Sequence, residues 1–271
     1  MQRCLVVAIV LAACSNASSF TDARPVDAAS PALTARLAPP GSACSPHALV
    51  TFVIDDGALA DYTVKKPIFD VHRAVAVAAI ISTRRSLSDD QLREMEAAGW
   101  EIANHSRTHP DLATLPGSEV ENEVAGAQAD LAARGFKVNV FVYPYGRSNA
   151  LVHGIASRYH RATVRVGGGL NHWQRGAGVD LGRYNFGTQY ARPGQNTLTF
   201  YESKVDSAGK NSEWLIYMVH QLLGADAQNL GDLLDYIHAQ GIPIVTVTEG
   251  LRLLWPCQVR GRAGAGSDRS S

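Results

Sequence analysis

The chain has 271 residues, with 46% hydrophobic residues and 25 basic against 25 acidic side chains, so its formal net charge is zero. A formal net charge of zero gives no indication of a nucleic-acid-binding protein or of electrostatic attachment to an anionic membrane. The apolar content is sufficient for one substantial core.

The first segment, residues 1–14, reads MQRCLVVAIVLAAC and combines Arg3 with a short apolar run that ends at Cys14. This pattern predicts an export signal, because the run is too short for a membrane-spanning helix. Its end, LAAC, resembles the bacterial lipobox, so we expect lipidation of Cys14, with ordinary cleavage near Ala13 as the alternative. Ser15 after the cysteine favours an outer-membrane lipoprotein of the cell envelope that touches the membrane through its lipid alone.

The region that follows the signal is divided by composition. Residues 15–43 are rich in Ala, Pro, Ser and Thr and predict a flexible tether, and residues 258–271 predict a disordered tail. One domain is expected over residues 44–257. Cys44 and Cys257 lie at its two ends, and an exported protein meets oxidising conditions, so we predict a disulfide between them, with two free thiols as the alternative. Closing so long a loop would stabilise the fold by roughly 4–5 kcal/mol.

Predicted strands and helices alternate along this domain. Pro67 suits the first turn of a helix, Ser88 suits an N-cap, and Gly99 and Gly135 suit helix ends. Near-continuous apolar runs indicate strands that are buried on both faces. The predicted strands are 48–57, 74–82, 100–104, 137–144, 213–222 and 242–247, and the predicted helices are 61–73, 87–100, 118–135, 232–241 and 248–255.

Polar side chains collect where the predicted strands end. Alternating strands and helices predict a parallel α/β sheet or barrel, in which ligands bind at the carboxyl ends of the strands. Each fragment alone could be an ordinary turn, but together they predict one site. The candidates in chain order are Asp55, Asp56, His105, His109, Tyr145, Arg183 and His220.

The residue types at these strand ends suit a metal site. A catalytic zinc-like site needs about three protein ligands and an open position for water, which one carboxylate and two imidazoles supply. A second carboxylate beside the metal could then accept a proton from water. Pro110 directly after His109 indicates that the two histidines lie on a loop and not on one helix face.

Four stretches of the sequence resemble a known family. VTFVIDDG (50–57), NHSRTHPDL (104–112), FVYPYG (141–146) and YMVHQ (217–221) resemble motifs of the polysaccharide deacetylases, carbohydrate esterase family four. The resemblance covers roughly residues 48–255. It implies a distorted (β/α) barrel with fewer than eight complete units.

The resemblance also implies roles for the candidate residues. Asp56, His105 and His109 would hold a divalent metal, commonly zinc, with cobalt, nickel and manganese as alternatives. Asp55 would be the general base, and His220 would protonate the leaving amine.

Two further roles follow from the same resemblance. The backbone N–H of Tyr145 would stabilise the oxyanion. Many family members have an arginine at the position of Val142, so the arginine that pairs with the catalytic aspartate is expected elsewhere. Arg183 is our prediction for it, with Arg165 as the alternative.

Less specific expectations concern two loops. Ser106 or Thr108 could brace the histidine loop through hydrogen bonds from side chain to backbone. The glycine-rich segment 165–178 lacks the ending of a phosphate-binding loop, and we expect it to cover the cleft and contact sugar through Asn171, His172 and Trp173. The other histidines of the domain are expected to be structural or solvated.

The sequence thus predicts a metal-dependent enzyme that removes N-acetyl groups from an N-acetylglucosamine-containing polysaccharide, with this acetylated polymer as its partner and a monomer as the expected state. Three alternatives stay open: an O-acetyl esterase on a polysaccharide, a non-catalytic carbohydrate-binding lipoprotein, and a glycoside hydrolase that uses Asp55 with a second carboxylate. Against the last, neighbouring aspartates on a strand should point to opposite sides.

Overall fold

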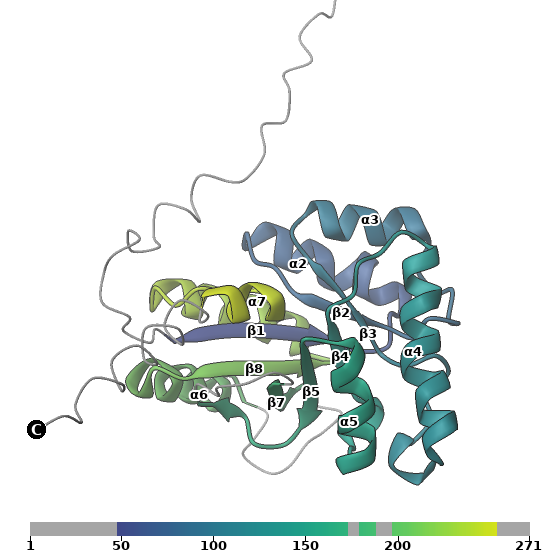
Figure 1. Cartoon of the computed structure of the whole chain (residues 1–271). Helices are drawn as coiled ribbons and strands as arrows, with labels where there is room; N and C mark the ends of the chain where they lie inside the picture. The colour runs from purple at the N-terminus through teal and green to yellow at the C-terminus, as the bar shows by residue number, and fades with distance from the viewer. Residues whose placement is uncertain (1–47, 173–178, 188–196, 254–271) are drawn as a thin grey trace, which may run out of the picture. The chain divides into compact units, whose positions relative to one another are not determined.

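The computed structural model describes residues 48–172, 179–187 and 197–253. Its centre is a barrel of parallel strands in which the last strand pairs back onto the first, residue by residue along its whole length (Figure 1). This confirms the predicted distorted (β/α) barrel. The seven strands, in order around the barrel, are β1 (Leu49–Ile54), β2 (Val77–Ile80), β3 (Glu101–Asn104), β4 (Val140–Val142), β5 (Ala162–Val166), β7 (Val179–Phe186) and β8 (Trp214–Val219).

Most strands contribute apolar residues to both faces because the barrel has an inner and an outer core. In β1, Leu49 and Val53 belong to the inner cluster, together with Ile216 of β8. Phe52 lies on the outer face of β1 and stacks on Tyr217 of β8, with ring centroids 5.4 Å apart. Burial on both faces accounts for the near-continuous apolar runs in the sequence.

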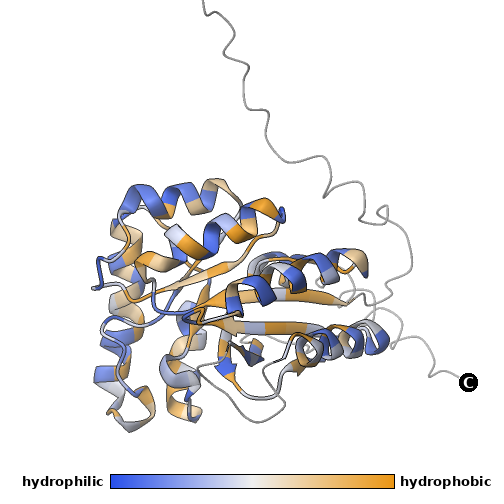
Figure 2. Ribbon diagram, turned by 180° about the vertical axis from the view of Figure 1, so that it is seen from behind, coloured by the Kyte–Doolittle hydropathy of each residue, from blue (hydrophilic) through white to orange (hydrophobic). Residues whose placement is uncertain are grey.

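Helices surround the barrel and turn their polar faces to solvent, so that the strands are mostly orange and the helices carry blue on the outside (Figure 2). Ser88 and Gln91 form a capping box at the start of the helix that follows β2, as the sequence predicted for Ser88. No helix in the described ranges is long and apolar enough to span a bilayer. The helices are α2 (Lys66–Val71), α3 (Asp89–Ala97), α4 (Gly117–Ala133), α5 (Ala150–Tyr159), α6 (Leu198–Asn211) and α7 (Asp226–Ala239), with a further helix at 247–253.

The predicted strand at 242–247 is wrong in extent. It is reduced to a single parallel bridge between Ile244 and Val50. The reason is that β1 already pairs with β8 along one edge and with β2 through Val53 and Ile54 on the other. Only the first half of that second edge remains, and there Val50 N–H donates to Pro243 while Val245 N–H donates back to Val50. The segment 242–247 therefore adds only a short stretch of pairing beside the first half of β1.

The prediction that the glycine-rich segment covers the cleft is also wrong for its described part. Strand β6 (Leu170–Asn171) pairs antiparallel with the first residues of β8, at the end of the barrel opposite His220. Asn171 is buried there, and its side chain exchanges hydrogen bonds with the backbone of Gly182 in β7 and donates to Trp214. It closes the gap between β7 and β8 because these two strands pair only through the last residues of β7. His172 is paired with Glu213 at this same end, and Trp173 lies outside the described residues.

The predictions for the chain ends also fall outside the described residues. They are the signal peptide at 1–14 with Cys14, the tether at 15–43, the disulfide between Cys44 and Cys257, and the tail at 258–271. All of them remain predictions.

Candidate active site

Strand alternation brings four predicted site residues to the inside of the barrel. Asp55, His105 and His220 each follow directly after the last residue of β1, β3 and β8, and Arg183 lies inside β7. Each continues the inward-facing series of its own strand, as Asp55 does after Leu49 and Val53. The carboxyl ends of parallel strands meet at one rim, so residues from distant parts of the sequence converge there.

Asp55 is held by Arg183 in a buried two-point ion pair. Nη1 and Nη2 of Arg183 donate to Oδ1 and Oδ2 of Asp55, each at 2.6 Å. Burial alone would raise the pKa of Asp55, but the Arg183 guanidinium, with His105 and His220 nearby, holds that pKa below its ordinary value. Asp55 is therefore an ionised acceptor. Arg165, the alternative partner, instead pairs with Asp180 on the neighbouring strand.

Asp56 does not follow the strand alternation that the sequence argument assumed. Its φ is 81°, in the left-handed region that non-glycine residues rarely adopt, so the chain turns sharply after Asp55. The Asp56 carboxylate consequently reaches the same site, with Oδ1 3.7 Å from Nε2 of His105 and 3.5 Å from Nε2 of His109. The two neighbouring aspartates therefore face one site instead of opposite sides. His105 and His109 belong to the same site.

Asp56, His105 and His109 fit a divalent metal. Their ligand atoms all lie within 4.8 Å of one another. A tetrahedral ion with bonds of about 2.0–2.1 Å needs ligands about 3.3 Å apart, close to the 3.7 and 3.5 Å that separate Asp56 from His105 and His109. His105 gives the strongest indication, because Nδ1 bonds the Val142 carbonyl at 2.7 Å while the buried Nε2 has no hydrogen-bond partner. An unpaired buried nitrogen is costly unless a ligand occupies it.

The protonation state of His105 suits the same role. Burial lowers the pKa of His105 to about 4, although the Asp55 carboxylate opposes this. Its imidazole is therefore neutral at physiological pH, and a metal binds the neutral form of histidine. A hydrogen bond from one ring nitrogen to a carbonyl, as His105 makes with Val142, fixes the tautomer that presents the other nitrogen to the metal.

Tyr145 lies beside the two histidines. It belongs to the short 3-10 turn η3 (Pro144–Gly146) directly after β4, and its ring centroid is 4.7 Å from that of His109. Its backbone is left-handed, with φ 56°. The next residue must be glycine, because a Cβ on Gly146 would lie 2.1 Å from the Val166 side chain. This turn places the Tyr145 backbone at the rim where the strand ends converge.

His220 faces both aspartates. Its Nε2 is 3.7 Å from Oδ2 of Asp55 and 4.0 Å from Oδ2 of Asp56. Burial lowers the pKa of His220, although the two carboxylates raise it. The imidazole is therefore neutral at rest, and it must take up a proton before it can donate one.

Two polar features beside this site were missed by sequence reasoning. Asp61 and Lys65 form a fully buried ion pair at 2.6 Å within the π-helix η1 (Asp61–Lys65) that follows β1. Their spacing of four residues is a signal for such a pair, but it does not reveal burial. Asn185 continues the inward series of Arg183, and its buried Oδ1 has no hydrogen-bond partner.

Three of the other histidines make structural contacts, in agreement with the prediction that such histidines are structural or solvated. His160 is buried and accepts from Asn104 on the outside of the barrel. His153 lies against the Tyr143 hydroxyl at 3.0 Å, and His72 pairs with Asp235 at 2.7 Å.

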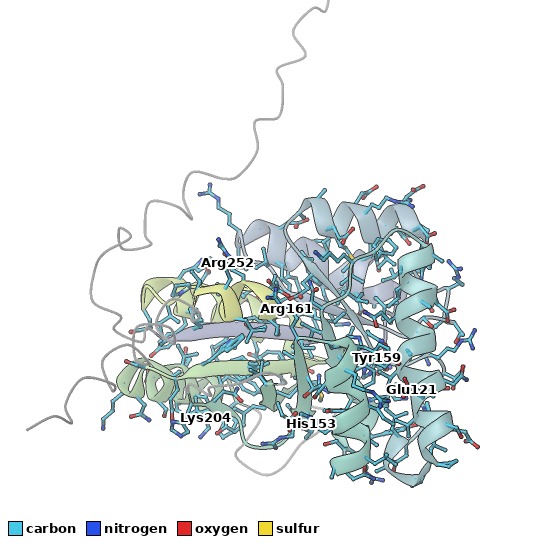
Figure 3. The ribbon with its side chains drawn as sticks, in the orientation of Figure 1. Glu121, His153, Tyr159, Arg161, Lys204 and Arg252 are labelled. Atoms are coloured by element: carbon cyan, nitrogen blue, oxygen red, sulfur yellow. The ribbon has the colours of Figure 1, made fainter. Side chains whose placement is uncertain are left out.

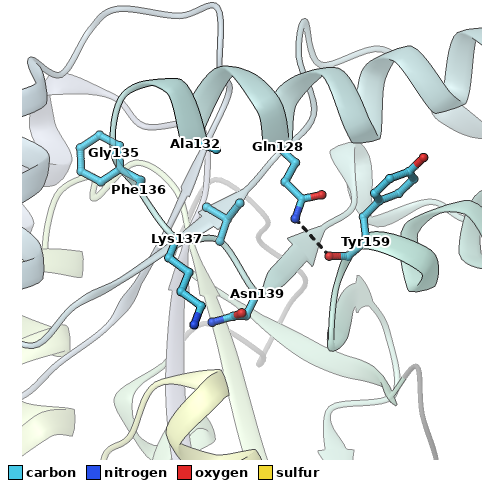
Figure 4. A pocket seen from close by; sticks show the side chains of 8 residues that line it. Gln128, Ala132, Gly135, Phe136, Lys137, Asn139 and Tyr159 are labelled. Carbon is cyan, nitrogen blue, oxygen red and sulfur yellow. Dashed lines mark hydrogen bonds between the residues drawn. The ribbon is translucent and has the colours of Figure 1, made fainter.

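A separate pocket of about 380 Å³ lies where β4 and β5 begin, at the end of the barrel opposite the site (Figure 4). Its wall includes Gln128, which donates to the Tyr159 carbonyl, and the aliphatic stem of Lys137. It contains no group of acidic, histidine or cysteine side chains, so the chemistry of the described residues is concentrated at the other end.

Comparisons with known proteins agree with this geometry. Residues 42–164 match the model of the polysaccharide deacetylase family. The chain therefore resembles this family, as its sequence motifs predicted. Its matched region contains the two aspartates, both histidines and the Tyr145 turn.

The individual relatives of this chain are distant. It is 41% identical over 56 residues to the chitooligosaccharide deacetylase of Bradyrhizobium sp. (strain ANU 289), a stretch that is 21% of this chain and 26% of that relative. The Xyl-CE4 domain of a multidomain xylanase from the hindgut metagenome of Trinervitermes trinervoides has a TM-score of 0.58 and 18% identity, covering 76% of this chain and 90% of that one.

A pseudoenzyme of carbohydrate esterase family 4 from Bacillus anthracis has the same fold, with a TM-score of 0.55 and 18% identity over 78% of this chain and 66% of that one. At such identities the likeness to solved structures shows the fold alone.

Proposed function

We propose that this protein is a metal-dependent hydrolase that removes N-acetyl groups from an N-acetylglucosamine-containing polysaccharide. The observation that carries the proposal is the convergence of Asp55, Asp56, His105, His109 and His220 at one rim of the barrel, with the buried Nε2 of His105 lacking a partner. A non-catalytic binding protein has no need for an ionised buried carboxylate, an Asp-His-His set and a second histidine in one place.

In this proposal Asp56, His105 and His109 hold the ion, for which we propose zinc. The ion, when bound, supplies a Lewis acid that makes a water more acidic and polarises the acetyl carbonyl. The donor set of one carboxylate and two imidazoles suits zinc and also cobalt, nickel or manganese.

The remaining steps belong to the protein's own side chains. Asp55, kept ionised by Arg183, accepts the proton that the attacking water loses. The backbone N–H of Tyr145 donates to the acetyl carbonyl oxygen as negative charge develops on it. His220 holds a proton at Nε2 and delivers it to the leaving nitrogen when the bond from carbon to nitrogen breaks, which yields acetate and a free amine.

His220 can obtain its proton within the site. Its Nε2 lies 3.7 Å from Oδ2 of Asp55, the neighbouring oxygen of the same carboxylate that accepts the first proton. A small movement closes this gap to hydrogen-bond distance, so the proton that Asp55 accepts can pass on to His220. Arg183 favours this transfer because it makes Asp55 a weak base that gives up its proton readily.

The test is acetate release from N-acetylglucosamine oligomers by the purified protein, with metal content measured in the same sample. We expect about one metal per chain, release that stops on chelation, and recovery when zinc is returned. Bound metal with release only from O-acetylated xylan would replace the proposal by the esterase alternative. A folded sample that takes up no zinc or cobalt would contradict the metal site itself.

We further propose that the protein is exported and attached to the cell envelope through lipid on Cys14. The support is the short apolar run with LAAC at its end. Replacing Cys14 with Ser should release the protein from the membrane fraction, and unchanged membrane attachment would contradict lipidation.

A further inference from the structure

The loop that bears the two histidines has an unusual backbone. Ser106 and His109 both have positive φ, 64° and 68°, although neither is glycine. Such a backbone conformation is strained in a residue with a side chain, and it persists only where the surroundings hold it. The position of His109 therefore depends on whatever holds this loop.

Every backbone N–H from Ser106 to His109 donates to a side chain. Ser106 donates to Oδ1 of Asn104 at 2.8 Å, and His109 donates to Oγ of Ser106 at 2.9 Å, so Ser106 braces the loop as the sequence analysis expected. These two bonds stay within the loop and its own strand. They fix its shape but not its position against the rest of the molecule.

The two middle N–H groups donate to one carboxylate on another element. Arg107 N–H and Thr108 N–H both donate to Oε2 of Glu123, at 2.9 and 2.8 Å, and the Thr108 hydroxyl donates to Oε1 at 2.7 Å. Glu123 lies on α4 and is only 7% exposed. Hydrogen bonds to an ionised acceptor are the stronger kind, and a buried carboxylate is retained only where it is paired.

The opposite side of the loop is held by backbone. The loop carbonyls of Ser106 and Arg107 accept from Ser82 and Thr83, in the segment after β2. This side continues the pairing of β2 with β3. On the α4 side the Arg107 side chain donates to Asp130 and Asn122, whereas Glu123 accepts from the backbone of the loop itself, next to His109.

We propose that Glu123 is the positioning residue of the metal centre, holding His109 at its distance from Asp56 and His105. The inference rests on the proposed metal site. Metal affinity would then be controlled from α4, although this helix contributes no metal ligand. The effect is exerted through hydrogen-bond geometry, since Glu123 contacts backbone and a hydroxyl and touches neither histidine ring in the contacts described above.

The test is zinc affinity of the purified chain, measured by competition with a chromophoric chelator. Glu123→Ala should weaken zinc binding by about 10–100-fold, the usual effect of removing an outer partner of a ligand. Glu123→Gln should restore binding close to wild type, because its amide oxygen can still accept both N–H groups while its amide donates to the Thr108 hydroxyl. The visible spectrum of the cobalt-loaded protein should change in Glu123→Ala and return in Glu123→Gln.

Two control variants separate positioning from general damage. Glu121→Ala changes a carboxylate on the same helix that faces α5, where it pairs with Arg158 and Tyr159 (Figure 3), so zinc affinity should not change. Leu131→Ala makes a cavity in the core under α4, so the unfolding temperature should fall while zinc affinity and the cobalt spectrum stay as in wild type.

Several results would overturn the inference. Equal zinc affinity in Glu123→Ala and wild type would overturn it while leaving the metal site intact. An equal loss of zinc affinity in Leu131→Ala would mean that Glu123→Ala acts only by destabilising the fold. A loss in Glu123→Gln as large as in Glu123→Ala would mean that the negative charge of Glu123 matters and not its hydrogen bonds to the loop. A wild-type chain that binds no zinc would overturn the proposed function as well, so the two failures are distinguishable.

Discussion

Arg183 and Asp55 form a two-point ion pair inside the barrel, with both guanidinium distances at 2.6 Å and both side chains almost completely buried. Arg183 lies in β7 and Asp55 follows β1, so the pair joins strands that are separated in sequence by most of the domain. It keeps Asp55 ionised and also places a fixed charge near His105 and His220.

Removing this arginine should destabilise the fold. Arg183→Met leaves a buried carboxylate without its partner, which costs about 3–5 kcal/mol. Arg165→Met is the matched control, because its pair with Asp180 is partly exposed and such pairs contribute about 0–1 kcal/mol. Urea unfolding at pH 7 measures both. Equal losses in the two variants would contradict the importance of the buried pair.

The proposed role of Asp55 as the base can be tested separately from metal binding. Asp55→Asn should keep the metal but lower the rate of acetate release about 10²–10⁴-fold, because the amide cannot accept the proton from water. Metal content by elemental analysis and turnover on N-acetylglucosamine oligomers are measured on the same sample. A rate like that of wild type would exclude Asp55 as the base.

His109→Ala should weaken metal binding strongly, because it removes one of three ligands. The control is His153→Ala, which changes a histidine that lies against Tyr143, outside the metal cluster. Zinc competition compares the two proteins. Retained affinity in His109→Ala would remove His109 from the ligand set.

Stability should fall in mild acid because of His160. Burial lowers the pKa of His160 to about 4, below the unfolded value of 6.5, so the unfolded chain binds more protons between these two pH values. The His160 contribution is complete above pH 6.5 and is lost as the pH falls to 4, about 3 kcal/mol in all. Unfolding free energies of wild type and His160→Gln across this range measure it.

The comparison must be a difference between variants, because Asp61 has the opposite effect. Burial raises the pKa of Asp61 to about 6, so its contribution is lost as the pH rises through that value. Wild type and His160→Gln share Asp61, and their difference isolates His160. A difference that does not change between pH 6.5 and 4 would contradict the assignment.

The disulfide also remains to be tested. Cys44→Ala should lower the unfolding temperature of the oxidised protein without changing zinc affinity, because a closed loop restricts the unfolded chain. Reduction of the wild type should have the same effect. No shift in either experiment would mean that Cys44 and Cys257 are free thiols.

Sequence patterns alone predicted a parallel α/β sheet or barrel and the strand-end location of the site, whereas the distorted barrel and the choice of Arg183 came from the resemblance to the family. Periodic apolar runs, an N-cap such as Ser88 and the polar residues at strand ends are local signals, and they follow from elementary preferences of the chain. The family motifs add the roles of the aspartates and histidines. These predictions hold because the carboxyl ends of all the strands of a parallel barrel lie at one rim, whatever the details of side-chain packing.

Tertiary structure decided what depends on distant contacts. Residues 242–247 have the composition of a strand, yet β2 already pairs with the second half of the same edge of β1, so only the first half can pair with them. Asn171 resembles a loop residue but fills the gap between β7 and β8, and the left-handed turn at Asp56 puts two neighbouring carboxylates in one site. Glu123 on α4 gives no local signal at all, because its importance lies in two backbone N–H groups that only the folded chain brings to it.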